Sequence, residues 1–208
     1  MSFMKIVQYP HPALRHPVKP LASIDKQVHL YVGKMLDLMY EANGLGLAAN
    51  QVALPYQVFV MNTSTGDERD RSQELVCINP VITERKGTIE GEEGCLSFPG
   101  LYQKVRRAKT VRLQAYNLQG EQFEVAASDL AARVIQHEAD HLAGVLYIDK
   151  MSMLGKMSSR SVLRSFEHEF EQAQQRGQMP STKVLLEAIE RGDLPELPPP
   201  ASAETPVL

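Results

Sequence analysis

The sequence has little cysteine and no long apolar run. Its two cysteines, Cys77 and Cys95, among 208 residues cannot build a disulfide scaffold, although one bridge between them is an alternative to two free thiols. No stretch approaches the roughly 18 apolar residues of a membrane span, and the N-terminus resembles neither a signal peptide nor a transit peptide. A net charge of −3 weighs against sequence-independent binding to nucleic acid. We therefore expect a cytoplasmic protein with no membrane segment and no direct nucleic-acid specificity.

The composition is that of an ordinary globular chain, with 43% hydrophobic and 23% charged residues. Prolines recur between residues 4 and 22 and indicate an extended arm. Apolar residues at helical spacing from Asp25 to Ala42 predict an amphipathic helix whose methionines fill the core. We expect one main domain over residues 1–154, a helical C-terminal extension over residues 155–192 and a Pro-rich, disordered tail over residues 193–208.

The middle of the chain is rich in short apolar and β-branched segments, which predict strands. These strands would begin near Tyr56, Leu75, Thr110 and Glu121, the last two joined by a hairpin turn at residues 118–120. Helical patterns follow from Ser128 to Gly144, from Ser158 to Arg176 and from Thr182 to Arg191. We therefore predict an α+β fold in which antiparallel β-sheets pack around the helix that begins at Ser128, with an N-terminal helix and a C-terminal helical extension.

That predicted helix contains two histidines four residues apart with a glutamate between them, the HExxH pattern. On an α-helix a step of four residues returns to nearly the same face, so His137 and His141 can reach one metal ion. Glu138 lies about 100° round the helix from His137, where it can act as a general base without ligating the metal. Leu130 and Val134 share the stripe of the histidines, which therefore face inward and need polar partners. The pattern favours a metal site over two histidines of the core.

A catalytic metal typically takes three protein ligands and keeps a fourth position for water. The candidates for the third ligand are Cys95, in a turn-like stretch, and a downstream glutamate, Glu167 or Glu171. Cysteine is a softer metal ligand than glutamate, which favours Cys95. Cys77 is not a candidate, because it lies among apolar strand residues and is expected to be a small buried hydrophobe. With a downstream glutamate the chain would be a zinc endopeptidase that cuts internal peptide bonds. The residues alone leave both alternatives open.

Three motifs in one order resemble the signature motifs of the peptide deformylase family: GLGLAANQ from Gly44, EGCLS around Cys95 and QHEADHLAG from Gln136. The resemblance extends from Ile6 to Lys150. It implies a metalloenzyme that hydrolyses the N-formyl group from the formyl-methionine of newly synthesised polypeptides and releases formate. It also implies that Cys95, His137 and His141 bind Fe²⁺, for which Zn²⁺, Ni²⁺ or Co²⁺ can substitute.

Carried over residue by residue, the resemblance makes Glu138 the catalytic acid and base. It makes the side-chain amide of Gln51 and the backbone N–H of Leu96 the donors to the oxyanion. Gly44 and Gly46 have no Cβ, so the backbone of an extended substrate can approach them closely. Because the substrate emerges at the ribosome, the ribosome is a candidate partner alongside the N-formyl-methionyl nascent chain.

By position in the motifs, the methionine side chain would contact Leu45, Gly91, Arg133, Val134 and His137. Arg133 departs from the aliphatic wall of many bacterial members, and its head would either reach water or narrow the pocket. Metal-bound imidazoles usually donate their second N–H to a carboxylate or a carbonyl. Two acids are candidates for orienting a histidine or for pairing with Arg107, namely Glu93 and Asp140.

Overall fold

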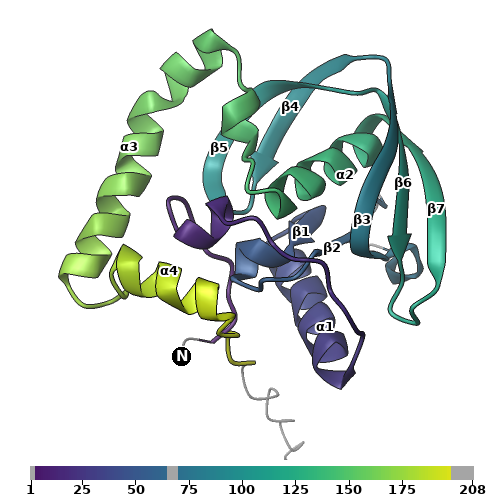
Figure 1. Cartoon of the computed structure of the whole chain (residues 1–208). Helices are drawn as coiled ribbons and strands as arrows, with labels where there is room; N and C mark the ends of the chain where they lie inside the picture. Colours follow the sequence, from purple (N-terminus) through teal and green to yellow (C-terminus); the bar gives the residue numbers. More distant parts are fainter. Residues whose placement is uncertain (1–2, 65–69, 198–208) are drawn as a thin grey trace, which may run out of the picture.

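Figure 1 shows the chain as a computed structural model, which describes residues 3–64 and 70–197. The α-helices are α1 (Lys26–Glu41), α2 (Asp129–Leu142), α3 (Met153–Gln175) and α4 (Thr182–Arg191). The strands are β1 (Gly46–Ala48), β2 (Val58–Met61), β3 (Leu75–Lys86), β4 (Ile89–Cys95), β5 (Phe98–Arg107), β6 (Thr110–Tyr116) and β7 (Gln122–Ser128). The chain is therefore α+β, as the sequence predicts.

The strands form a five-stranded sheet in the order β1-β2-β3-β6-β7 and a separate hairpin of β4 and β5. Every pair within them is antiparallel, which confirms the predicted sheet type. Helix α2 contacts each strand of the five-stranded sheet. Its Arg133 also donates to the carbonyl oxygens of Val105 on β5 and Ile89 on β4. The helix thus lies between the sheet and the hairpin, as Figure 1 shows.

Helix α1 forms because its apolar residues recur on one face and its start is capped. The side chain of Asp25 accepts a hydrogen bond from the backbone N–H of Val28 at 2.9 Å, as an N-cap residue does. Met35 and Met39 are fully buried in the core beside β1 and β2. The predicted role of these methionines as core residues is confirmed.

The two ends of α2 are set by backbone geometry more than by side-chain caps. Ser128 occupies the predicted N-cap position, but its side chain makes no capping hydrogen bond. Gly144 follows the helix with φ of +73°, and a Cβ there would lie 2.5 Å from the carbonyl oxygen of Arg15. Leu130 was expected on the inward stripe, but it is 46% exposed because it lies in the first turn. The buried stripe begins one turn later.

The hairpin of β4 and β5 is not predicted from the sequence, which reads as a turn around Cys95. Strand β4 contains two glycines and three glutamates, residue types that are rare in strands. Its pairing with β5, from Ile89 opposite Arg107 to Cys95 opposite Phe98, overrides that local preference. Cys95 is consequently the last residue of β4, and its backbone is paired with Phe98 on β5.

Of the two C-terminal helices, α3 begins earlier than predicted and α4 does not differ from the prediction. Helix α3 starts at Met153 and not at Ser158, because the side chain of Ser152 caps it by accepting from Gly155 N–H at 3.1 Å. Helix α4 has the predicted bounds. At the start of the predicted tail, Leu194 and Leu197 pack against the core and the backbone N–H of Met4 donates to the carbonyl oxygen of Glu196. Residues 198–208 lie outside the described residues.

Both cysteines are free, so the alternative of a disulfide is excluded. Cys77 is fully buried on β3, where burial raises the pKa of its thiol. Within residues 3–64 and 70–197, none of the helices combines the length and the apolar character that crossing a membrane requires.

Candidate metal centre

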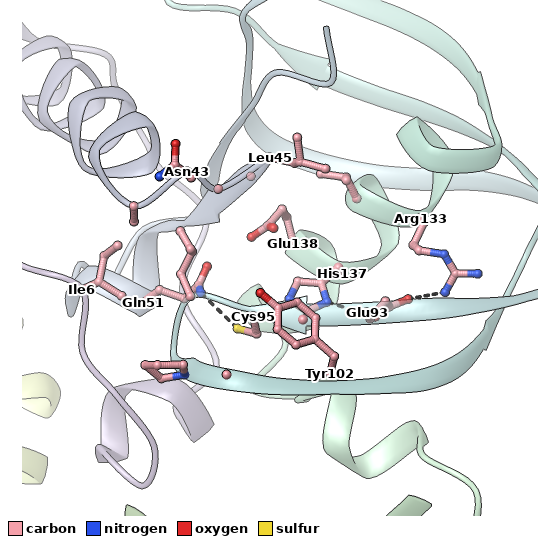
Figure 2. A pocket seen from close by; sticks show the side chains of 18 of the residues that line it. Ile6, Asn43, Leu45, Gln51, Glu93, Cys95, Tyr102, Arg133, His137 and Glu138 are labelled. Atoms are coloured by element: carbon pink, nitrogen blue, oxygen red, sulfur yellow. Dashed lines mark hydrogen bonds and ion pairs between the residues drawn. The ribbon is translucent and has the colours of Figure 1, made fainter. Parts of the chain in front are cut away.

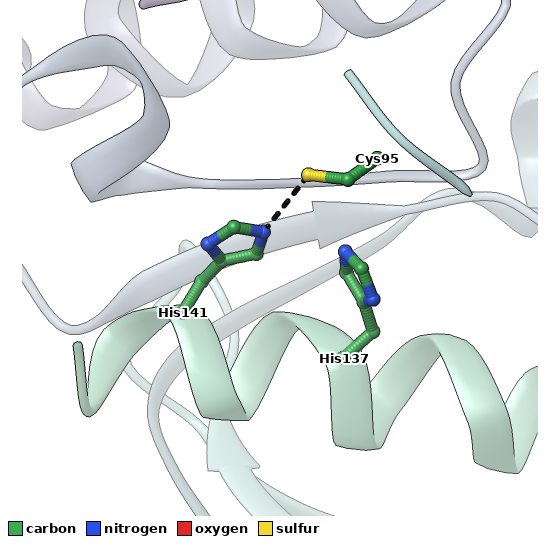
Figure 3. A group of neighbouring side chains, drawn as sticks. All are labelled: Cys95, His137 and His141. Carbon is green, nitrogen blue, oxygen red and sulfur yellow. Dashed lines mark hydrogen bonds between the residues drawn. The ribbon is translucent and has the colours of Figure 1, made fainter. Parts of the chain in front are cut away.

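Three potential metal ligands converge between the end of β4 and the middle of α2. Cys95 ends β4, and His137 and His141 lie one turn apart on α2 (Figure 3). Each offers one ligand atom, and these atoms lie within 4.8 Å of one another. The Cys95 Sγ and His141 Nε2 atoms are 3.2 Å apart. A thiolate and two imidazoles so placed suit a first-row transition metal.

His137 is oriented by an acid from the hairpin. Its Nδ1 atom lies 3.1 Å from Glu93 Oε2, which leaves its other ring nitrogen for the side of the ring that faces Cys95. Burial alone would lower the pKa of His137, but hydrogen bonds to Cys95 and Glu93 and the charges of Cys95 and Glu138 raise it to about 10. The surroundings of His137 thus favour positive charge, which is the condition that a bound cation satisfies.

Glu93 is itself buried and held by two arginines. Arg107 donates to both of its carboxylate oxygens at 2.8 Å, and Arg133 donates to Oε1 at 2.6 Å. Burial would raise the pKa of Glu93, but the hydrogen bonds from Arg107 and His137 outweigh it and hold the carboxyl well below its usual range. Asp140 pairs with Arg107 and with Lys150. Of the two acids considered from the sequence, Glu93 both orients a histidine and pairs with Arg107, whereas Asp140 supports the arginine.

Glu138 lies on α2 beside the three ligands and is 4% exposed. Figure 2 shows its carboxylate pointing into the pocket, and its Oε2 atom has no hydrogen-bond partner among the described residues. Burial raises the pKa of Glu138 to about 7, although the charge of His137 opposes the shift. A carboxylate with a pKa near neutrality and a free oxygen can accept and return a proton at physiological pH.

Gln51 approaches the same centre from the motif that begins at Gly44. Its Oε1 atom accepts from the backbone N–H of Ala48 at 2.8 Å, which fixes the orientation of the amide. Its NH₂ group therefore faces Cys95 Sγ at 3.4 Å and Ser97 Oγ at 3.2 Å (Figure 2). A donor group is thereby held beside the candidate metal ligands.

A cavity of about 570 Å³ opens beside these residues. The predicted substrate-contacting residues that line it are Gly44, Leu45, Gly46, Leu96, Arg133, Val134 and His137. Gly46 packs against Glu138, since a Cβ at Gly46 would lie 2.6 Å from the Glu138 Oε1 atom. The absence of a side chain at Gly46 thus leaves room for the carboxylate.

Gly91 was expected to line the cavity but does not, because the guanidinium of Arg133 lies between Gly91 and the cavity. A Cβ at Gly91 would come within 2.8 Å of Arg133 Nη2. Of the two alternatives considered for Arg133, the structure does not have the head extended into water: the head is buried against Glu93 and two backbone carbonyl oxygens. Arg133 is one of the residues that line the cavity.

The cavity also has walls that the sequence does not predict. Ile6 and Gln8 reach it from the N-terminal arm, Asn43 from the end of α1, and Pro99 and Tyr102 from β5. No motif marks these residues, and β5 itself is not evident in the sequence. Their positions follow from the path of the arm and from the hairpin, which depend on long-range packing.

The downstream glutamates lie away from the centre. Glu167 accepts a hydrogen bond from the Tyr9 hydroxyl at 2.9 Å, and Glu171 is exposed on α3. In the described part of the chain, the group of three ligands close enough to share an ion consists of Cys95, His137 and His141. His11, which lies in the N-terminal arm, is buried and accepts from the backbone N–H of Ala13.

The fold and the site together indicate a class of protein, an α+β enzyme with a candidate metal site on its buried helix α2. The particular family follows from comparison with known proteins. A family model described as polypeptide deformylase matches residues 3–157, and the chain belongs to that family.

Curated relatives and solved structures agree with this assignment. The chain is 41% identical over 184 residues to the peptide deformylase of Rhodopirellula baltica, covering 88% of this chain and 90% of the relative. It is 42% identical over 154 residues to that of Neisseria gonorrhoeae, covering 74% and 90%. The structure is similar to Arabidopsis thaliana peptide deformylase 1B, with a TM-score of 0.76, 38% identity and coverage of 86% and 96%. It is also similar to the Plasmodium falciparum enzyme, with a TM-score of 0.77, 36% identity and coverage of 80% and 97%.

Proposed function

We infer that this chain hydrolyses the N-formyl group from the N-terminal formyl-methionine of newly synthesised polypeptides and releases formate. The observation that carries the inference is membership of the polypeptide deformylase family over residues 3–157. The buried Glu138 beside a cysteine and two histidines supplies the residue types that such a hydrolysis requires.

We assign Cys95, His137 and His141 as the ligands of the metal and Fe²⁺ as the natural ion, with Zn²⁺, Ni²⁺ or Co²⁺ as substitutes. The donor set fits a metal because the three ligand atoms are close together and Glu93 holds His137 with one ring nitrogen directed to the centre. When bound, the metal makes water acidic near neutral pH and polarises a carbonyl. A ferrous thiolate centre suits a reducing compartment, which supports the cytoplasm as the location. The substrate forms during translation, which supports the same location and the ribosome as a partner.

The residues around the centre have distinct tasks in this proposal. Glu138 accepts the proton of the attacking water and delivers it to the methionine nitrogen as the C–N bond to the formyl group breaks. The side-chain NH₂ of Gln51 and the backbone N–H of Leu96 donate to the oxygen of the formyl group as it gains negative charge. Gln51 is suited to this task because Ala48 holds its amide in one orientation.

The substrate backbone would lie along the residues of the first motif. Gly44 and Gly46 give it a close approach, and the methionine side chain enters the cavity beside Leu45, Val134 and Arg133. Arg133 presents its aliphatic stem to that side chain while its head binds Glu93. The buried head sets the length of side chain that the cavity accepts.

The rival function, a zinc endopeptidase with a downstream glutamate as third ligand, is not favoured. Glu167 is hydrogen-bonded to Tyr9, and the curated relatives are named peptide deformylases. The two functions differ in the bond that is cut, so a substrate panel separates them.

The test is an anaerobic preparation assayed on three substrates of matched sequence: a formyl-methionyl peptide, the acetyl-methionyl peptide and an internal fragment with blocked ends. We expect formate release from the first, with no acetate from the second and no cleavage of the third. Cleavage of the internal fragment, or an inactive metal-loaded protein on the formyl peptide, would contradict the proposed function.

A further inference from the structure

The N-terminal arm joins the two segments that carry the proposed oxyanion donors. The backbone N–H of Val7 donates to the carbonyl oxygen of Gln51 at 2.8 Å, and the N–H of Tyr9 donates to the carbonyl oxygen of Ser97 at 3.0 Å. Ser97 in turn lies against the centre, since its own N–H is 3.4 Å from Cys95 Sγ. Because both bonds leave one short stretch of the arm, the arm constrains the separation of these two backbones.

Tyr9 connects this arm to the C-terminal extension. Its ring stacks on Phe98, the residue that follows Ser97, with ring centroids 5.1 Å apart. Its hydroxyl donates to Glu167 Oε1 on α3 at 2.9 Å. Burial and the contact with Glu167 raise the pKa of Tyr9 to about 12, so the hydroxyl keeps its proton and remains a donor. Phe98, on which the Tyr9 ring stacks, also contacts Phe166 of α3 edge-on.

Helix α3 is largely exposed. Its buried residues are Gly155, Ser159 and Phe170, out of 23. Phe170 lies edge-on to His11 of the same arm, at 6.3 Å between ring centroids. Figure 1 shows α3 lying apart from the sheet, with the purple arm on the side of the body that faces it. Helix α3 is thus held by its contacts with β5, by Leu163 and Phe166 against the core, and by the contacts of Phe170 and Glu167 with the arm.

We propose, resting on the proposed function, that Tyr9 is a positioning residue for deformylation. Glu167 holds the Tyr9 hydroxyl, and Tyr9 holds the arm that fixes Gln51 and Ser97 relative to each other. Through these contacts the C-terminal extension sets the geometry of the oxyanion donors without touching the substrate. Small displacements of such donors lower the rate of the chemical step more than they lower substrate affinity.

The test compares Tyr9→Phe and Glu167→Leu with the wild-type protein, each loaded with the same metal and assayed on a formyl-methionyl peptide well below its Tm. Tyr9→Phe keeps the ring on Phe98 and removes only the hydroxyl. For each of the two variants we expect a kcat about 5–10-fold lower with KM changed less than about twofold. The double variant should be no worse than either single one, because both remove the same contact.

Two matched variants separate positioning from general stability. Glu167→Gln retains an acceptor for the Tyr9 hydroxyl, and its kcat should return to within about twofold of the wild type. Glu171 is exposed and lies one helical turn after Glu167 on α3. Glu171→Leu should therefore leave kcat, KM and metal content unchanged.

The outcomes distinguish this inference from the function on which it rests. Wild-type kcat in Tyr9→Phe and Glu167→Leu, with only Tm lowered, would overturn the inference and leave the function intact. A loss of kcat that Glu167→Gln does not restore would also overturn it. A metal-loaded wild-type protein that releases no formate would overturn the function, and the inference with it.

Discussion

Helices α2 and α3 carry similar side chains and use them differently. Both place histidine and glutamate close together, in HEADH on α2 and in EHEFE on α3. Nine of the 14 residues of α2 are buried, including His137, Glu138 and His141, whereas three of the 23 residues of α3 are. Burial between the sheet and the hairpin gives His137 a fixed partner in Glu93 and shifts the pKa values of His137, Glu138 and His141. On α3 the same residue types are mostly solvated, and Glu167 binds a tyrosine hydroxyl.

The largest difference between the helices should appear when one buried glutamate loses its charge. Glu138→Gln preserves size and removes the proton acceptor, so kcat should fall by about 10²–10⁴-fold. Metal content should not change, because Glu138 is not among the three ligands. Formate release and metal analysis of the same sample make the measurement. A fully active variant would show that Glu138 is as dispensable as a surface glutamate of α3.

The acid that supports α2 from the hairpin should matter next. Glu93→Gln removes the carboxylate that holds His137 Nδ1, and metal affinity should fall by about 10–100-fold. Competition with a chelator measures this change. Glu92→Gln is the matched control, since Glu92 is the exposed neighbour on the same strand. Equal affinities for the two variants would mean that the orientation of His137 does not depend on Glu93.

A smaller effect, on the pH dependence of stability, is expected at His11, where the arm contacts Phe170 of α3. Burial lowers the pKa of His11 from 6.5 to about 4, so the unfolded chain binds a proton between these values that the folded chain does not. The stability that neutral His11 contributes is therefore complete above pH 6.5 and is lost as the pH falls towards 4, by up to about 3 kcal/mol.

Unfolding by urea at pH 7 and at pH 4.5, with a chelator present throughout, measures this loss. His11→Asn keeps an acceptor for Ala13 N–H and should lose less stability on acidification than the wild type. His168→Asn, on the exposed face of α3, should behave as the wild type does. Identical acid sensitivity in all three proteins would refute the assignment of a titrating burial cost to His11.

The helices show what local pattern can predict. Periodic apolar residues and end signals define α1, α2 and α4 to within a residue or two, because both act over one or two turns. The HExxH spacing likewise brings His137 and His141 to one face through helix geometry alone. Cys95 comes from a strand more than 40 positions away in the sequence; the residues alone favoured it only slightly as the third ligand, and the motif resemblance decided the choice.

What the sequence does not predict depends on packing between distant segments. The hairpin of β4 and β5 is rich in glycine and glutamate and forms through pairing with a partner strand. The direction of Arg133 is set by Glu93 and by carbonyl oxygens of both hairpin strands. The contact between Tyr9 and Glu167 spans 158 positions. No local pattern reports on such contacts.

The identity of the third ligand tests the account most directly, because it decides whether the metal site on α2 takes its third ligand from the hairpin or from α3. X-ray absorption spectroscopy of the zinc-loaded wild-type protein gives the donor atoms and their distances. We predict one sulfur at about 2.3 Å and two imidazole nitrogens at about 2.0–2.1 Å, with the sulfur lost in Cys95→Ser. A spectrum with only nitrogen and oxygen donors in the wild-type protein, unchanged in Cys95→Ser, would contradict the account.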